Sequence, residues 1–159
     1  MSFYVFDEDD DPRLPTLMIG TNTDAQVERM TPEASDADEA RWNFAFWTQN
    51  ALRIVGGSMD PRGQEIVDEA FEVCGLSFAD EDLGLEENSV ESEMTKLFVD
   101  TCVTVAQQLH RDGVLVATFG RAIPIVVHEL EYYDEIVEQT REANPVGLVD
   151  DFARWVDSF

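Results

Sequence analysis

A stripe of seven apolar residues between Ser89 and Asp112 constrains the fold of this chain more than any other feature. Its members recur at spacings of three and four residues over about five turns, which is the period of an amphipathic α-helix. They are Val90, Met94, Leu97, Phe98, Cys102, Val105 and Leu109. Gly113 follows the last of them and is a suitable C-terminal stop. The sequence therefore predicts a long helix over 89–112.

Four more segments carry the same period, and capping residues mark their ends. Ser35 is a good N-cap with acidic residues in the turn that follows it, and Gly56 comes after the last periodic position. Asp60 caps the next segment, Pro61 takes its first helical position, and Gly75 closes it. The predicted helices are 35–55, 61–74, 89–112, 129–143 and a last one that contains 148–156.

Extended structure is predicted only for short segments. Phe3–Phe6 and Thr16–Ile19 are apolar runs on either side of an acidic loop, which favours a hairpin, with a flexible segment over 1–12 as the alternative. The β-branched run 114–119 predicts a buried strand. Residues 123–127 fit either a strand or the first turn of a helix.

The whole chain is predicted to be mainly α, a single domain over 1–159 with about five helices and a small N-terminal hairpin or short strands. Its length suits one domain, and its hydrophobic content of 44% is sufficient for a core. Cys74 and Cys102 fall on predicted apolar helix faces without CxxC spacing. We therefore expect two buried thiols rather than a disulfide.

The charge of the chain excludes some classes of partner. Asp and Glu number 34 against 10 Lys and Arg, the formal net charge is −24, and Lys96 is the only lysine. Such a surface repels nucleic acid and anionic membranes and attracts cationic partners. The first residues lack the basic and apolar regions of a secretory signal, and no apolar run approaches a membrane span. The sequence predicts a soluble, cytoplasmic protein.

One stretch begins like a zinc-protease motif. In His128–Tyr132 a histidine and a glutamate are followed by a tyrosine where the second histidine of that motif would stand. Helical spacing would put His128, Glu131 and Glu135 on one face, with Glu138 beyond them, and such a set can hold a metal ion. The other interpretation is a solvated acidic face. No GxSxG, P-loop or GxGxxG pattern is present, so the sequence predicts no catalytic residue and no cofactor.

Three further features each have two interpretations. His110 stands at a predicted helix C-terminus, where it interacts favourably with the helix dipole, and catalysis is the alternative. Arg121 lies between two apolar runs, where it either pairs with a carboxylate or binds an anionic ligand. An aromatic patch on two sides of the predicted 35–55 helix indicates a central core helix or a groove for a partner or a second copy. Its members are Trp42, Phe44, Phe46 and Trp47.

Two stretches of this chain resemble a known group of proteins. They are 42–50 and 119–145, the second of which includes His128–Ile136 and ends at Ala143-Asn144-Pro145. Both are similar to an uncharacterised group of bacterial domain-of-unknown-function proteins, some of which are proposed immunity proteins of toxin systems. The resemblance implies a small bacterial cytoplasmic protein, and it brings no catalytic residues with it.

Charge and resemblance together predict an acidic protein-binding module, in its sharpest form an immunity-type inhibitor of a basic protein. A mimic of nucleic acid is a weaker variant, because the acids cluster irregularly instead of following phosphate spacing. A metal-binding protein or metal-assisted enzyme is one alternative, an accessory protein whose acidity reflects its host is another, and a homodimer stays open. The residues expected to contact a partner are Asp80, Glu81, Asp82, Glu86, Glu87, Glu131, Glu135 and Glu138.

Overall fold

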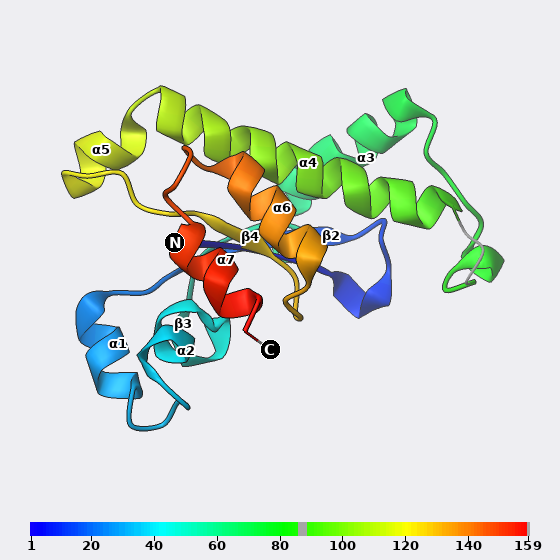
Figure 1. The fold of residues 1–159 in the computed structure, drawn as a ribbon. Coiled ribbons are helices and arrows are strands. Elements are labelled where there is room, and N and C mark those ends of the chain that lie inside the picture. The colour runs from blue at the N-terminus through cyan, green and yellow to red at the C-terminus, as the bar shows by residue number, and fades with distance from the viewer. Residues whose placement is uncertain (86–88, 159) are drawn as a thin grey trace.

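A four-stranded mixed sheet forms the centre of the molecule (Figure 1). The computed structural model describes residues 1–85 and 89–158, and for 49–52 and 89 it describes the backbone alone. The strands lie in the order β3-β2-β1-β4, where β1 pairs antiparallel with β2 and parallel with β4, and β2 pairs antiparallel with β3. Their bounds are β1 Ser2–Asp7, β2 Pro15–Thr21, β3 Thr48–Gly56 and β4 Val126–His128.

The prediction of a mainly α, five-helix domain is wrong, because the described residues form an α/β fold with a real sheet. The α-helices are α1 Asp24–Met30, α2 Ala37–Trp42, α3 Pro61–Cys74, α4 Ser89–Arg111, α5 Val114–Phe119, α6 Asp134–Ala143 and α7 Asp150–Val156. Short 3-10 turns are η1 Glu8–Asp10, η2 Phe44–Phe46 and η3 Asp80–Asp82. The predicted helices over 61–74 and 89–112 and the N-terminal hairpin are confirmed.

The helix predicted over 35–55 is the largest error. It breaks into α2, η2 and β3 because the segment contains two N-caps instead of one. The Asp36 carboxylate accepts from the Glu39 backbone N–H and starts α2, whereas the Asn43 amide oxygen accepts from the Ala45 N–H and starts η2. Beyond that point the chain is extended and pairs with β2. Apolar residues at helical spacing therefore contribute to a strand and a turn.

Three smaller boundaries also differ from the predictions. The expected strand over 114–119 is helix α5, which continues from α4 after Gly113 turns the chain at φ +67°, and no described strand lies beside it. The helix expected from 129 begins at Asp134, because 129–133 form the turn that leaves β4. Residues 126–128 are a strand, which settles the ambiguity over 123–127 in favour of extended structure.

The sheet separates two apolar layers. Neighbouring side chains on a strand point to opposite faces, and Val126 and Val127 of β4 accordingly belong to different clusters. Val127 packs with Phe3 of β1 and Val103 of α4, whereas Val126 packs with residues of α2 and α7 such as Phe152. Figure 1 shows α4 running along one side of the sheet and α7 and α2 on the other.

Helix α6 covers the outer edge of β4. The Thr140 hydroxyl lies 3.1 Å from both the N and the O of Val127, and the Gln139 amide donates to the same carbonyl at 2.9 Å. The Asn144 side chain accepts from the Ile125 N–H at 2.9 Å and donates to its carbonyl at 2.7 Å, as a neighbouring strand would. An exposed strand edge would invite pairing with another chain. These side chains close it and hold α6 beside α4.

The two cysteines differ in burial. Cys102 is buried and burial raises its pKa to about 12, but Cys74 is exposed, so the expectation of two buried thiols fails at Cys74. Only Phe71 of α3 is fully buried, which leaves Cys74 at the solvent side of that helix.

Among the described residues no helix is both long and apolar enough to cross a membrane.

Candidate functional site

An open acidic groove of about 710 Å³ lies between α4 and α6. Five carboxylates line it, and they come from α4, from the turn after β4 and from α6: Asp100, Glu129, Glu135, Glu138 and Glu142. Lys96 is the one basic residue among the described lining residues. The groove exists because α6 is held against β4 and thus runs beside α4, with acidic residues of both helices turned toward the space between them.

The carboxylates of this groove are poorly neutralised. Lys96 Nζ lies 2.6 Å from Asp100 Oδ2, and the Tyr133 hydroxyl donates to Glu129 Oε2 at 3.0 Å. Glu135 and Glu138 form no ion pair with a basic side chain of the described chain. The pKa of Tyr133 is raised to about 12, first by burial, then by the hydrogen bond to Glu129 and by nearby glutamates. Negative potential is therefore concentrated at this groove.

A second cavity of about 330 Å³ adjoins the groove, with which it shares Thr95 and Glu129. We call it the strand-end pocket, because it opens where β4 stops and β1 continues. It is lined by Tyr4, Val5, Phe6, Asp7, Asp10, Thr95, Glu129 and Leu130. Leu130 is 80% exposed at its rim. The pocket combines aromatic rings with carboxylates.

Asp7 is a partly buried acid that lines the strand-end pocket. Its Oδ2 accepts from the Thr95 hydroxyl at 3.4 Å, whereas its buried Oδ1 has no hydrogen-bond partner among the described residues. Burial raises the pKa of this carboxyl, and the neighbouring charges of Glu129, Asp11 and Glu91 raise it further. A cation placed beside Asp7 would reduce the repulsion between this carboxylate and the neighbouring acids.

A row of four aromatic rings ends at this pocket. The rings of Tyr132, His128, Tyr4 and Phe6 stack in that order, with successive centroids between 5.2 and 5.4 Å apart. His128 is 1% exposed, its Nδ1 donates to the Glu129 carbonyl at 2.7 Å, and its Nε2 has no partner among the described residues. Burial lowers the pKa of His128 to about 4, so the ring is neutral at pH 7.

The metal site suggested by His128, Glu131 and Glu135 receives no support. These residues do not share one helix as predicted, because His128 lies buried on β4 and Glu135 lies on α6, with residues 129–133 between them. No group of three or more His, Cys, Asp or Glu side chains suited to a metal ion occurs within residues 1–85 and 89–158.

The predicted partner-contacting acids divide into separate groups. Glu135 and Glu138 line the groove, and exposed Glu131 lies in the turn beside it. Asp80–Asp82 form the exposed turn η3, where Asp80 pairs with Arg13 at 2.6 Å, so this loop is tied to the hairpin. Glu86 and Glu87 lie outside the described residues. Asp7, Asp100, Glu129 and Glu142 were not predicted, because only the fold brings them together.

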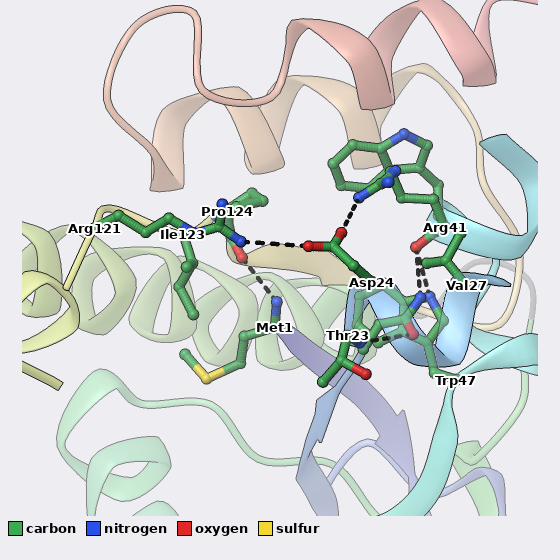
Figure 2. Close-up of a pocket in the computed structure, with 11 residues that line it drawn as sticks. Met1, Thr23, Asp24, Val27, Arg41, Trp47, Arg121, Ile123 and Pro124 are labelled. Atoms are coloured by element: carbon green, nitrogen blue, oxygen red, sulfur yellow. Dashed lines mark hydrogen bonds and ion pairs between the residues drawn. The ribbon is translucent and has the colours of Figure 1, made fainter. Parts of the chain in front are cut away.

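A third, smaller cavity of about 130 Å³ is lined by Arg121, the residue for which binding of an anionic ligand was one of two interpretations (Figure 2). Asp24 lies between two arginines, 3.1 Å from Arg41 Nη1 and 3.9 Å from Arg121 Nη2. The Met1 amino group donates to the Pro124 carbonyl at 2.9 Å, and burial lowers its pKa to about 5. An internal carboxylate thus already occupies the space between the cations, which favours the ion-pair interpretation of Arg121.

The two remaining sequence features have structural roles. His110 Nε2 lies 3.1 Å from Asn144 Oδ1, so it helps to orient the side chain that pairs with Ile125. Trp42 and Trp47 are buried in the layer that contains α7, and Phe44 packs against the same layer. Three of the four patch residues therefore belong to the core, whereas Phe46 is half-buried and is in neither apolar cluster, and the patch does not lie on one helix as expected.

No protein-family model, curated protein or solved structure matches this chain. The resemblance of 42–50 and 119–145 to bacterial domain-of-unknown-function proteins therefore stays a prediction.

Proposed function

We propose that this protein is a binding module for a basic protein, and that the groove between α4 and α6 is its contact surface. The observation that carries the proposal is the set of five carboxylates around one open groove with a single lysine among them. Arginine and lysine side chains of a partner would supply the missing charge and form charge-assisted hydrogen bonds. An immunity-type inhibitor, which covers the basic surface of a toxin, is the sharpest form of this function.

Electrostatics determines how such binding should behave. Complementary charge raises the association rate more than it raises the final affinity, and salt screens it over about 8 Å at physiological ionic strength. The exposed glutamates of α6 are separated from the core by the helix itself, so their replacement by glutamine should leave the fold intact. Affinity and folding can therefore be tested independently.

A capped hexa-arginine peptide labelled with a fluorophore is a suitable probe. The groove variant replaces Glu135, Glu138 and Glu142 by glutamine. A matched control variant, Glu28→Gln with Glu33→Gln and Asp38→Asn, removes the same charge from exposed sites on or near α1 and α2. We expect about tenfold weaker binding by the groove variant, from roughly 0.5 kcal/mol for each exposed charge, and a smaller loss by the control. Equal losses in both variants would refute a specific groove.

The natural partner can then be sought in a lysate of the source organism. A basic protein retained by the unmodified chain and by the control at low salt, absent from the groove variant and released at moderate salt, would support the proposal. Retention of the same proteins by all three would mean that general acidity, and not the groove, is responsible.

A further inference from the structure

The acidic groove follows the line along which two helices lie side by side. α4 and α6 run in the same direction (Figure 1), and near their C-terminal ends the Gln107 amide donates to the Glu142 carbonyl at 3.0 Å. The groove lies beyond this contact, toward the N-terminal halves of both helices. Its least exposed lining residues on these helices are Val99, Thr95 and Gln139, which form the floor. In helical bundles, a third helix fills such a space between two packed helices.

The wall formed by α6 presents carboxylates at helical spacing. They belong to the exposed residues Glu135, Glu138 and Glu142. With a rise of 1.5 Å per residue, they lie about 4.5 and 6 Å apart along the helix axis. Cations at i, i+3 and i+7 of an incoming helix, or at i, i+4 and i+7 of an antiparallel one, have the same spacing. An extended segment places residues of one side about 7 Å apart, so its cations would fall out of register with these glutamates.

The groove offers few backbone groups to a partner. Apart from those of their first and last turns, the N–H and C=O groups of α4 and α6 are bonded within the helices. Behind α6, the outer edge of β4 is closed by the side chains of Thr140 and Asn144. An extended partner would find no strand edge to pair with here, whereas a helical partner satisfies its own backbone.

Lys96 makes the two walls electrostatically different. Its Nζ lies 2.6 Å from Asp100 Oδ2; the hydrogen bond to Asp100 raises the pKa of Lys96, and the charges of Asp100 and Glu142 raise it further. On the α4 wall Lys96 thus offsets Asp100, whereas Glu135 and Glu138 of α6 form no ion pair with a described basic side chain. The cations of a partner are therefore attracted to the α6 wall and repelled near Lys96.

From the space between the helices, the spacing of the glutamates and the lack of a strand edge, we propose that the basic partner presents an α-helix to the groove. One stripe of that helix carries arginine or lysine side chains that face Glu135, Glu138 and Glu142, and the side toward Lys96 carries no cation. This inference rests on the proposed function, which it makes more specific.

Three capped eighteen-residue peptides of alanine and glutamine, each with four arginines, test the inference. In the one-face peptide the arginines stand four, three and four residues apart. In the isomer two of them are moved to the opposite face of the helix, and the proline peptide has the arginines of the first with a central proline that breaks the helix. In fluorescence titrations at low salt, we expect the one-face peptide to bind about fivefold tighter than the isomer and about tenfold tighter than the proline peptide.

The site and the form of the bound peptide are measured separately. In the full chain labelled with nitrogen-15, amide shifts caused by the one-face peptide should concentrate at 92–100 and 135–142. Circular dichroism should show that this peptide gains helix content when it binds. Equal affinity for the one-face peptide and its isomer, equal affinity for the proline peptide, or no gain in helix content would overturn the inference.

Variants of the walls provide a second line of evidence. The groove variant should bind the one-face peptide and the isomer equally, whereas the control variant should keep the fivefold preference. Lys96→Gln should tighten the one-face peptide about twofold, and the matched Arg62→Gln, at an exposed site on α3, should change it less. Equal gains in the two variants would contradict the assignment of the walls.

The failure of this inference can be distinguished from the failure of the proposed function. If the groove variant loses hexa-arginine binding while the three helical probes bind equally well, the groove binds cations but selects no helix. If hexa-arginine binding falls equally in the groove variant and in the control variant, the proposed function itself fails, and the helix inference fails with it.

Discussion

Replacing His128 by phenylalanine isolates the energetic effect of one buried imidazole. The ring lies in the row between Tyr4 and Tyr132, so phenylalanine preserves the stacking shape. The substitution removes the bond from Nδ1 to the Glu129 carbonyl and also the buried Nε2 that has no described partner. Its main consequence should be a change in how stability depends on pH.

The size of that change follows from the pKa. Burial lowers the pKa of His128 from 6.5 to about 4. The unfolded chain therefore binds the proton first as the pH falls, and the free energy of unfolding decreases between 6.5 and about 4. At about 1.4 kcal/mol per pKa unit the full loss is about 3 kcal/mol, of which roughly 2 kcal/mol falls between pH 7 and pH 4.5. The phenylalanine variant lacks this term.

Urea unfolding at pH 7 and at pH 4.5 measures the effect. The unmodified chain should lose roughly 2 kcal/mol more than His128→Phe on going to the lower pH. Tyr132→Phe is the matched control, because its hydroxyl, which accepts from the Phe44 N–H at 2.9 Å, belongs to the same row. Burial raises the pKa of Tyr132 to about 12, so the control should shift both measurements equally. Parallel pH dependence in the unmodified chain and in His128→Phe would refute the reasoning.

Three further predictions follow from named contacts. Thr140→Val removes the fully buried hydroxyl that bonds both backbone groups of Val127, and urea unfolding should show a loss of about 1–3 kcal/mol, against less than about 0.5 kcal/mol for exposed Thr101→Val. Asp7→Asn should raise the melting temperature at pH 7, because a carboxyl with a raised pKa destabilises the fold once ionised; the gain should vanish as the pH falls below the ordinary value of 3.8. Gly57→Ala should destabilise by more than about 1 kcal/mol in thermal unfolding, because φ is +60° and a Cβ would lie 2.5 Å from Thr16 Oγ1.

The elements that could be predicted from the sequence are those with local signals. The helix α3 follows from Asp60-Pro61 at its start and Gly75 at its end, where Gly75 has φ +70°. The helix α4 follows from its long apolar stripe, of which Val105 is nevertheless exposed. The buried residues among those described in α4 are Met94, Val99, Cys102, Val103 and Ala106. Caps and periodicity act within a few residues of the chain, so they need no knowledge of the fold.

The elements that could not be predicted depend on distant partners. Residues 48–56 are a strand because β2 lies beside them. The only local signal against one continuous helix is the second cap, Asn43, which lies before this segment. Residues 126–128 are a strand because β1 and the side chains of α6 satisfy their backbone groups. Such pairing overrides local preference, which is weak for short apolar segments.

Only part of the candidate site could be predicted from the sequence, for the same reason. Glu135 and Glu138 were identified because they lie on a strongly acidic helix, but Asp100 on α4 carries no local sign of its role. In the sequence, Asp7 is only the first of five consecutive acidic residues over 7–11. The run in fact divides: Asp7 turns toward α4, whereas Asp11 pairs with Arg13 at 2.6 Å. A charge run in sequence is thus not a charged patch in space.

The distribution of the few basic residues bears on whether the acidity has a function. Arg13, Arg41, Arg121 and Arg154 form ion pairs with aspartates that lie away from the groove. Among the described residues that line the groove, Lys96 is the one basic side chain beside five carboxylates. Most carboxylates outside the groove also lack an ion pair among the described residues, so the groove is distinguished by five carboxylates that line one cavity, where crowded like charges oppose folding. Surfaces that depart from the best local choice are those expected to bind or react. A cationic partner, as proposed above, would reduce this crowding of like charges.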